Sequence, residues 1–303
     1  SPSASSMVVP LHRPLDVPVG DELLGRVLDG FGEPRDGRGP LGTSARASTD
    51  AMPPDAMSRR PITERFVTGL RVLDAMTAVG RGQRLGVFAP AGVGKSTLTA
   101  MLANGAQCDV KVIALIGERG REVSEFIEHS LGPKGLAQSV VVASTSDRPA
   151  VERAKSAQVA MTIAEHFRAQ GKSVLLVMDS VTRYARALRE IGLAGGEPPT
   201  RRGFPPSVFA ALPRLLERAG NDAHGSITAF YTVLVDSEDD ADPIAEEVRS
   251  ILDGHLILSR KLSQQNHFPA IDVLKSLSRL MHHVTPQEQQ RAASKLRNWL
   301  AKY

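Results

Sequence analysis

The stretch Ala89 to Thr97, which reads APAGVGKST, constrains the fold of this chain more than any other part of its sequence. It follows the aliphatic run Leu85 to Ala89 and precedes a segment of helical composition. A glycine-rich turn between a buried strand and a helix is the setting of a phosphate-binding loop. We therefore expect phosphate to be held by Ala91, Gly92, Val93, Gly94, Lys95, Ser96 and Thr97.

The residue types in this loop suit phosphate chemistry. Gly92 and Gly94 allow successive backbone N–H groups to turn toward phosphate oxygens, and the helix that begins near Lys95 adds its positive end. Lys95 is predicted to neutralise the β and γ phosphates, and the Ser96 hydroxyl is predicted to bind Mg²⁺. Ala89 stands where the usual pattern has its first glycine, but both inner glycines and the GKS sequence are intact. A plain glycine-rich turn is the weaker alternative, because it would not require the strand before and the helix after.

Short aliphatic runs alternate with helical stretches over most of the chain, and this alternation predicts an α/β fold with a mostly parallel sheet flanked by helices. The predicted strands are Leu85 to Ala89, Val110 to Gly117, Ser139 to Ala143, Ser173 to Met178, Ile227 to Val235 and His255 to Ser259. The predicted helices are Ser96 to Asn104, Glu122 to Leu131, Ala150 to Gln170, Val208 to Ala219 and Pro286 to Tyr303. A short sheet or arm is expected between Val17 and Leu41.

Two carboxylates stand at the ends of predicted strands. Asp179 ends the run Val174 to Met178, where an acid can reach Mg²⁺ from a strand near the phosphate loop. Glu118 follows another strand and is our candidate for the base that activates the attacking water. Taken alone, Asp179 could simply cap the next helix and Glu118 could form a surface ion pair. Because three strand ends converge in a parallel sheet, we favour the catalytic interpretation of both.

Composition excludes several other classes of protein. With 303 residues and 42% apolar content, the chain can fill a large core. The net charge of +4 is too small to indicate nucleic-acid binding, and 4% aromatic residues offer little for base stacking. The single cysteine, Cys108, excludes an internal disulfide framework and favours a reducing compartment, so a cytoplasmic protein is expected. No apolar run approaches the length of a membrane span.

Several longer blocks together indicate a family. They read LLGRVLDGFGEPRDGRGPL, FAPAGVGKSTL, IGERGREVSEFI, DPIAEEVRSILDGHLILSRKL and the long block from Asp179 to Gly220. From Val17 onward the chain resembles the export ATPases of type III secretion, which are relatives of the flagellar export ATPase and of the catalytic subunit of rotary ATP synthases. The resemblance implies a RecA-like P-loop core that hydrolyses ATP with Mg²⁺, powering chaperone release and the unfolding of effector proteins for export.

The same resemblance implies roles for three further residues. It makes Arg119 a support for the phosphates, beside Glu118 as the catalytic carboxylate. It makes Arg279 an arginine finger that enters the neighbouring subunit's site, a role that spacing alone does not indicate. It places Phe268, just before Pro269, against the adenine, although a phenylalanine there is equally compatible with a core position.

The resemblance also sets expectations for organisation and partners. Residues 1–16 are predicted to be a linker or remnant, residues 17–284 a RecA-like ATPase domain, and residues 285–303 the beginning of a truncated C-terminal helical domain. The expected partners are five further copies in a homohexamer, central stalk and stator proteins of the export apparatus, and effector–chaperone complexes. A cytoplasmic protein peripherally associated with the inner membrane is expected, with no nucleic acid.

Three alternatives differ from this main reading. The first is a flagellar export ATPase, although the sequence of the block from Asp179 to Gly220 is more similar to the virulence type. The second is a non-catalytic nucleotide-binding ring subunit, against which Glu118 argues because such subunits lack this carboxylate. The third is a hexameric RNA motor, which RNA-stimulated turnover and a steep salt dependence would identify.

Overall fold

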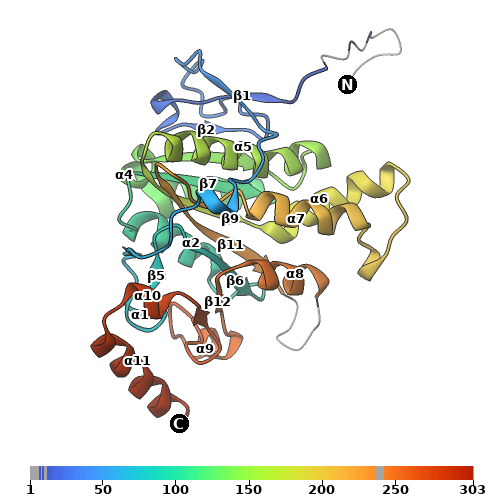
Figure 1. The fold of residues 1–303 in the computed structure, drawn as a ribbon. Helices are drawn as coiled ribbons and strands as arrows, with labels where there is room; N and C mark the ends of the chain where they lie inside the picture. The colour runs from blue at the N-terminus through green and yellow to red at the C-terminus, as the bar shows by residue number, and fades with distance from the viewer. Residues whose placement is uncertain (1–6, 8, 10–11, 236–241, 303) are drawn as a thin grey trace.

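The computed structural model has a central nine-stranded sheet with helices on both faces (Figure 1). The structure describes residues 12–235 and 242–302, together with Met7 and Val9. Within these residues the strand order is β13-β12-β6-β11-β9-β7-β8-β2, with β10 paired to β11. Along this path every pair is parallel except β12 with β13. The predicted α/β class is confirmed.

The strands of the main sheet are β2 (Val27–Leu28), β6 (Arg84–Ala89), β7 (Val110–Ile116), β8 (Ser139–Ser144), β9 (Ser173–Asp179), β10 (Gly220–Asn221), β11 (Ser226–Leu234), β12 (Gly254–Ile257) and β13 (Leu277–Ser278). Two small antiparallel sheets pair β1 (Asp16–Pro18) with β3 (Arg46–Ser48) and β4 (Arg65–Phe66) with β5 (Val79–Gly80). The helices are α1 (Arg71–Met76), α2 (Lys95–Gly105), α3 (Gly120–Glu125), α4 (Gly132–Ala137), α5 (Ala150–Ala169), α6 (Val181–Ala194), α7 (Pro206–Leu216), α8 (Pro243–Ile251), α9 (Arg260–Gln264), α10 (Met281–Val284) and α11 (Gln287–Leu300).

Alternation along the strands builds two cores on opposite faces of the sheet. On β9, Leu176 and Met178 pack into the core formed with α5, α6, α7 and α8. Leu175 and Val177 face the other way, into the core beneath α1 and α2. A strand that is apolar at every position is expected when both faces are covered, because neither face reaches water. The continuous aliphatic runs in the sequence have this cause.

The predicted strands match observed strands to within one or two residues, but the helices differ more. The predicted helix Glu122 to Leu131 is α3 followed by a π-helical turn, Phe126–Leu131. The predicted helix Val208 to Ala219 begins earlier, at Pro206, because proline suits the first turn of a helix. No range was predicted for α6, although the capping alternative for Asp179 assumed a helix at that place, and the short helices α1, α4, α8, α9 and α10 were not predicted. Figure 1 shows α6 and α7 extending side by side away from the sheet.

The N-terminal part of the chain joins the domain through strand pairing, and the C-terminal helix joins it through side-chain hydrogen bonds. The short sheet expected between Val17 and Leu41 exists in part, and β2 extends the main sheet by pairing with β8. Much of the predicted linker, residues 1–6, 8, 10 and 11, lies outside the described residues. The predicted C-terminal helix is α11, and Arg297 ties it to the domain by donating to the carbonyl oxygens of Val273 and Met76.

Candidate phosphate-binding active site

The predicted phosphate loop joins β6 to α2. Gly92 and Gly94 have φ values of 79° and 89°, in the left-handed region that glycine adopts without strain. Gly94 is the N-cap residue immediately before α2, and Ser96 and Thr97 in the first turn of that helix are exposed. The loop therefore has the backbone conformation, the helix N-terminus and the exposed hydroxyl groups that a phosphate with a bound cation requires.

Sheet order brings the two predicted carboxylates to this loop. Lys95 follows β6, Asp179 ends β9 and Glu118 follows β7. In the sheet these strands stand in the order β6, β11, β9, β7, and all four are parallel, so their carboxyl ends share one edge. The expected convergence of three strand ends is observed.

The side chains meet in a compact ionic cluster. The Lys95 ammonium donates to Oε1 of Glu118 at 3.0 Å and also to Oδ1 of Asp179. The three side chains are 11%, 15% and 3% exposed, respectively. A helix cap was the alternative for Asp179, but α6 is capped by Ser180, whose hydroxyl accepts from the backbone N–H of Arg183. Asp179 is therefore free to serve the site.

The ionic cluster fixes the charge state of Lys95. Burial of the ammonium group lowers its pKa, but the nearby Asp179 and Glu118 carboxylates outweigh burial, so the pKa of Lys95 lies above its ordinary value. A raised folded-state pKa means that the stabilising effect is complete below the ordinary lysine pKa, about 10.4, and is lost as pH rises through the higher folded value. Lys95 is consequently charged over the whole physiological range.

A stability measurement tests this coupling. In the nucleotide-free protein, we expect Lys95→Met to lower the free energy of unfolding at neutral pH, because Asp179 and Glu118 then lie buried without their cation. The difference between wild type and variant should shrink above about pH 10.4, where the lysine of the unfolded chain loses its proton while Lys95 in the folded protein keeps it, and should vanish once the pH exceeds the higher folded-state pKa. Urea unfolding at a series of pH values measures both effects. A difference that stays constant up to pH 12 would show that the cluster does not stabilise the fold through charge.

Arg119 and Phe268 lie in the region that the resemblance implied. Arg119 follows Glu118 directly, but its side chain is 78% exposed and pairs with Glu122 at 3.3 Å, so it makes no contact with the ionic cluster. The Phe268 ring is half-exposed and lies next to the loop, where a methyl group added to Gly94 would be 3.5 Å from it. Of the two readings of Phe268, the core position is wrong.

Arg279 lies at the edge of the sheet formed by the amino ends of the parallel strands, opposite the edge that carries the phosphate loop. It follows β13, which runs antiparallel to β12, and its N–H donates to the carbonyl of Asp253 at 3.0 Å. The backbone N–H of Asp253 in turn donates to the carbonyl oxygen of Arg84, the first residue of β6. The phosphate loop follows Ala89, the last residue of the same strand. At about 3.3 Å per residue, the length of β6 separates Arg279 from the loop of its own chain by roughly 16 Å. Arg279 is exposed on that edge.

Two residues beside the site were missed from the sequence. Arg183, in the first turn of α6, packs against Gly117, and its Nε is buried without a hydrogen-bond partner among the described residues. Thr232, near the end of β11, donates to Oδ1 of Asp179 at 2.7 Å. Arg183 had a local signal, since it stands four residues after Asp179 at the start of a helix. Thr232 had none, because its place depends on the order of strands.

The donor set fits a nucleotide with a divalent cation. Ser96 offers a hydroxyl and Asp179 a carboxylate, and oxygen ligands of this kind suit Mg²⁺, which usually keeps several waters and takes few protein ligands. The Arg183 guanidinium, whose Nε–H has no partner among the described residues, and the Lys95 ammonium are cations suited to phosphate oxygens. The site therefore carries the groups required for both parts of the ligand.

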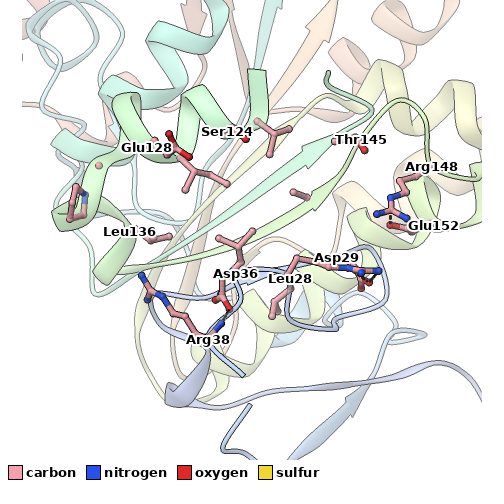
Figure 2. A pocket seen from close by; sticks show the side chains of 17 residues that line it. Leu28, Asp29, Asp36, Arg38, Ser124, Glu128, Leu136, Thr145, Arg148 and Glu152 are labelled. Atoms are coloured by element: carbon pink, nitrogen blue, oxygen red, sulfur yellow. Dashed lines mark hydrogen bonds and ion pairs between the residues drawn. The ribbon is translucent and has the colours of Figure 1, made fainter. Parts of the chain in front are cut away.

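A separate cavity of about 670 Å³ lies between the N-terminal segment and α3 and α4 (Figure 2). Figure 2 shows Arg148 and Glu152 at one end of it and Arg38 at the other. None of the predicted site residues lines it. The remaining walls are formed by Val27, Leu28, Asp29, Arg35, Asp36, Val123, Ser124, Ile127, Glu128, Gly132, Pro133, Leu136, Ala143 and Thr145.

Membrane insertion through a helix finds no support in the part of the chain that the structure describes, where every helix is too short or too polar to cross a bilayer.

Comparison with known proteins gives one consistent set of relatives. Residues 69–278 match the model of the ATP synthase alpha/beta family, nucleotide-binding domain. A type 3 secretion system ATPase of Xanthomonas euvesicatoria is 62% identical over 99% of this chain and 68% of its own length. A flagellum-specific ATP synthase of Treponema pallidum is 56% identical over 95% of this chain and 65% of its own length. The chain thus spans about two thirds of these relatives.

Solved structures agree with the sequence relatives. A prototypical ATPase from the type III secretion system of pathogenic bacteria is 55% identical, with a TM-score of 0.90 over 95% of this chain and 84% of that one. The assembled ATPase EscN from enteropathogenic E. coli is 54% identical, with a TM-score of 0.91 over 95% of this chain and 70% of that one. EscN has also been solved in complex with its central stalk, EscO.

Proposed function

We infer that this chain, which belongs to the ATP synthase alpha/beta family, is an ATPase whose turnover powers type III protein export. The observation that carries the enzymatic part is the meeting of Lys95, Glu118 and Asp179 at the carboxyl edge of the sheet, beside a left-handed glycine loop. The export part rests on relatives of more than 50% identity that are named for type III secretion.

The side chains divide the work of hydrolysis among themselves. Lys95 leaves its two carboxylates to bind the β and γ phosphates. Ser96 and Asp179 are the residues that would hold Mg²⁺, and the ion would supply neutralisation of the charge on the phosphate oxygens. Glu118, released from Lys95, orients the attacking water and takes its proton. In this proposal Arg119 turns from Glu122 to contact phosphate oxygens, Arg183 offers them its buried Nε–H, and Phe268 packs against the adenine.

The organisation and partners extend this proposal. We take residues 17–284 as the ATPase domain and residues 285–303 as the start of a helical domain, of which α11 is the first part. In this proposal the chain acts as one subunit of a homohexamer around a central stalk. The relative EscN has been solved as an assembled ATPase and in complex with its central stalk EscO, which supports the assembly. Stator proteins, effector–chaperone complexes and the cytoplasmic face of the inner membrane complete the expected setting.

A flagellar export ATPase is the second candidate, because flagellum-specific relatives are 54% to 56% identical to this chain. The type 3 secretion relative at 62% identity favours the virulence type. A non-catalytic ring subunit is disfavoured by Glu118, which is present and in contact with Lys95. An RNA motor would be recognised by turnover that RNA stimulates and salt suppresses.

The position of Arg279 predicts how activity depends on protein concentration. A ring in which each carboxyl edge faces the Arg279 edge of the next subunit completes every site between two chains. We therefore expect the Mg²⁺-dependent ATPase rate per subunit to rise with protein concentration until the ring is fully assembled. Phosphate release over a wide concentration range, with mass measured by light scattering on the same samples, tests this.

The outcomes of this experiment separate the possibilities. A rate that rises together with mass supports a site shared between subunits. A constant rate in a monomeric protein would show a self-sufficient site and would contradict the ring as the active form. Nucleotide binding without hydrolysis in a proven ring would instead favour the non-catalytic subunit.

A further inference from the structure

Thr232 is a buried polar residue on the strand that separates the phosphate loop from Asp179. In the sheet, β11 lies between β6 and β9, and Thr232 is paired with Val87 of β6. The next inward residue on the same face, Phe230, packs into the apolar core beneath α2. Thr232 therefore places a hydroxyl group beyond the apolar Phe230, at the end of this face nearest the phosphate loop.

The Thr232 hydroxyl makes one strong contact. Its Oγ1 donates to Oδ1 of Asp179 at 2.7 Å, and the residue is 1% exposed. An ionised carboxylate can only accept, so the direction of this bond is fixed. The other acceptor in reach, the carbonyl oxygen of Met178, is 3.4 Å away and is the weaker contact. The single hydroxyl proton of Thr232 is therefore donated to Asp179.

Lys95 and Thr232 donate to the same oxygen of Asp179, and in the proposed reaction one of these two hydrogen bonds is lost when nucleotide binds. Both described donors, Lys95 and Thr232, reach Oδ1, and no hydrogen bond from a described residue reaches Oδ2. In the proposed reaction Lys95 turns to the phosphates, as the lysine of a phosphate loop does. Thr232 then remains as the donor that fixes Oδ1, while Oδ2 is free for the cation or a water bound to it.

We propose that Thr232 is a positioning residue that holds the carboxylate of Asp179 in the orientation required to bind Mg²⁺ with nucleotide. The proposal rests on the proposed function, because it assigns the metal to Asp179. Thr232 itself touches neither phosphate nor metal. Its contribution is a fixed neutral donor, which keeps the Asp179 carboxylate in one orientation after the ammonium group has left.

The test compares Thr232→Val with Thr232→Ser. Valine keeps the branched shape but removes the hydroxyl, whereas serine keeps the hydroxyl. We expect Thr232→Val to raise the Mg²⁺ concentration needed for half-maximal ADP binding by about tenfold or more, the range seen when a partner of a metal ligand is removed. Thr232→Ser should stay within about threefold of wild type. Calorimetric titration of MgCl₂ into protein with ADP measures this, and ADP binding in EDTA should be equal in all three proteins.

Two further variants make the result specific. Thr228→Val removes a buried hydroxyl four residues earlier on β11, about 13 Å from Asp179. That hydroxyl accepts from the backbone N–H of Gly82 at 2.9 Å, so the variant loses stability without touching Asp179. It should leave the Mg²⁺ midpoint unchanged. Asp179→Asn should raise the midpoint at least as much as Thr232→Val.

Three results would overturn the proposal while leaving the proposed function intact. An unchanged Mg²⁺ midpoint in Thr232→Val, beside a raised one in Asp179→Asn, would show that the hydroxyl does not position the carboxylate. Equal effects of Thr232→Val and Thr228→Val would show a general loss of stability. Failure of serine to rescue would show that shape rather than the hydroxyl matters. By contrast, an unchanged midpoint in Asp179→Asn would overturn the metal site itself.

Discussion

Glu118→Gln is expected to abolish ATP turnover while nucleotide binding stays close to wild type. Glutamine keeps the size of glutamate and can still accept a hydrogen bond from Lys95, but its amide cannot take a proton from water. Loss of a general base lowers rates by about a hundredfold to ten-thousandfold. Release of phosphate from ATP measures turnover, and calorimetry with ADP and a non-hydrolysable ATP analogue measures binding.

Glu122→Gln is the matched control for Glu118→Gln. Glu122 lies in the first turn of α3, and its carboxylate pairs with the exposed Arg119. The same change of charge at Glu122 should therefore leave turnover within about twofold of wild type, since exposed ion pairs contribute little. A Glu118→Gln protein that hydrolyses ATP normally would refute the base. One that fails to bind nucleotide would show that Glu118 acts by holding Lys95.

The strands of this fold were predictable from sequence because burial on both faces makes them continuously aliphatic, as in Val110–Ile116. The signal for α6 was also present. Val181, Tyr184, Ala185 and Leu188 follow helical spacing, and Ser180 is a good cap. The π-helical turn after α3 was not predictable, since the sequence between Glu122 and Leu131 reads as one helix and only packing against α2 and α4 distinguishes the two.

Some residues of the candidate site were likewise predictable from sequence and others were not. Lys95, Glu118 and Asp179 could be placed together because each follows a strand, and the carboxyl ends of parallel strands share an edge. Thr232 could not, because sequence order does not reveal that β11 enters the sheet between β6 and β9. The distance of Arg279 from the phosphate loop of its own chain likewise depends on strand order, because β13 is the outermost strand of the sheet and runs antiparallel to β12. Local patterns thus identify residues near a strand end, whereas strand order decides their neighbours.

Arg279→Ala protein should be inactive alone but recover activity when mixed with Glu118→Gln protein under assembling conditions. Since Arg279 is remote from the loop of its own chain, its guanidinium can act on phosphate only in a neighbouring subunit. Loss of an arginine finger lowers turnover by about a thousandfold or more. In an equal mixture, a complete site forms where an Arg279→Ala subunit supplies Glu118 and its neighbour supplies Arg279. With random placement in a closed ring, about a quarter of the sites are complete.

The double variant Glu118→Gln/Arg279→Ala provides the control for this mixture. Combined with either single variant it assembles the same kind of ring, but no interface then contains both Glu118 and Arg279, so activity should not return. Native mass spectrometry identifies mixed rings, and phosphate release from the same samples measures turnover. Mixed rings of the two single variants that stay inactive would contradict a shared site, because their complete interfaces contain every residue to which the reaction is assigned. Recovery with the double variant would contradict it as well, since turnover would then occur without one of the two side chains.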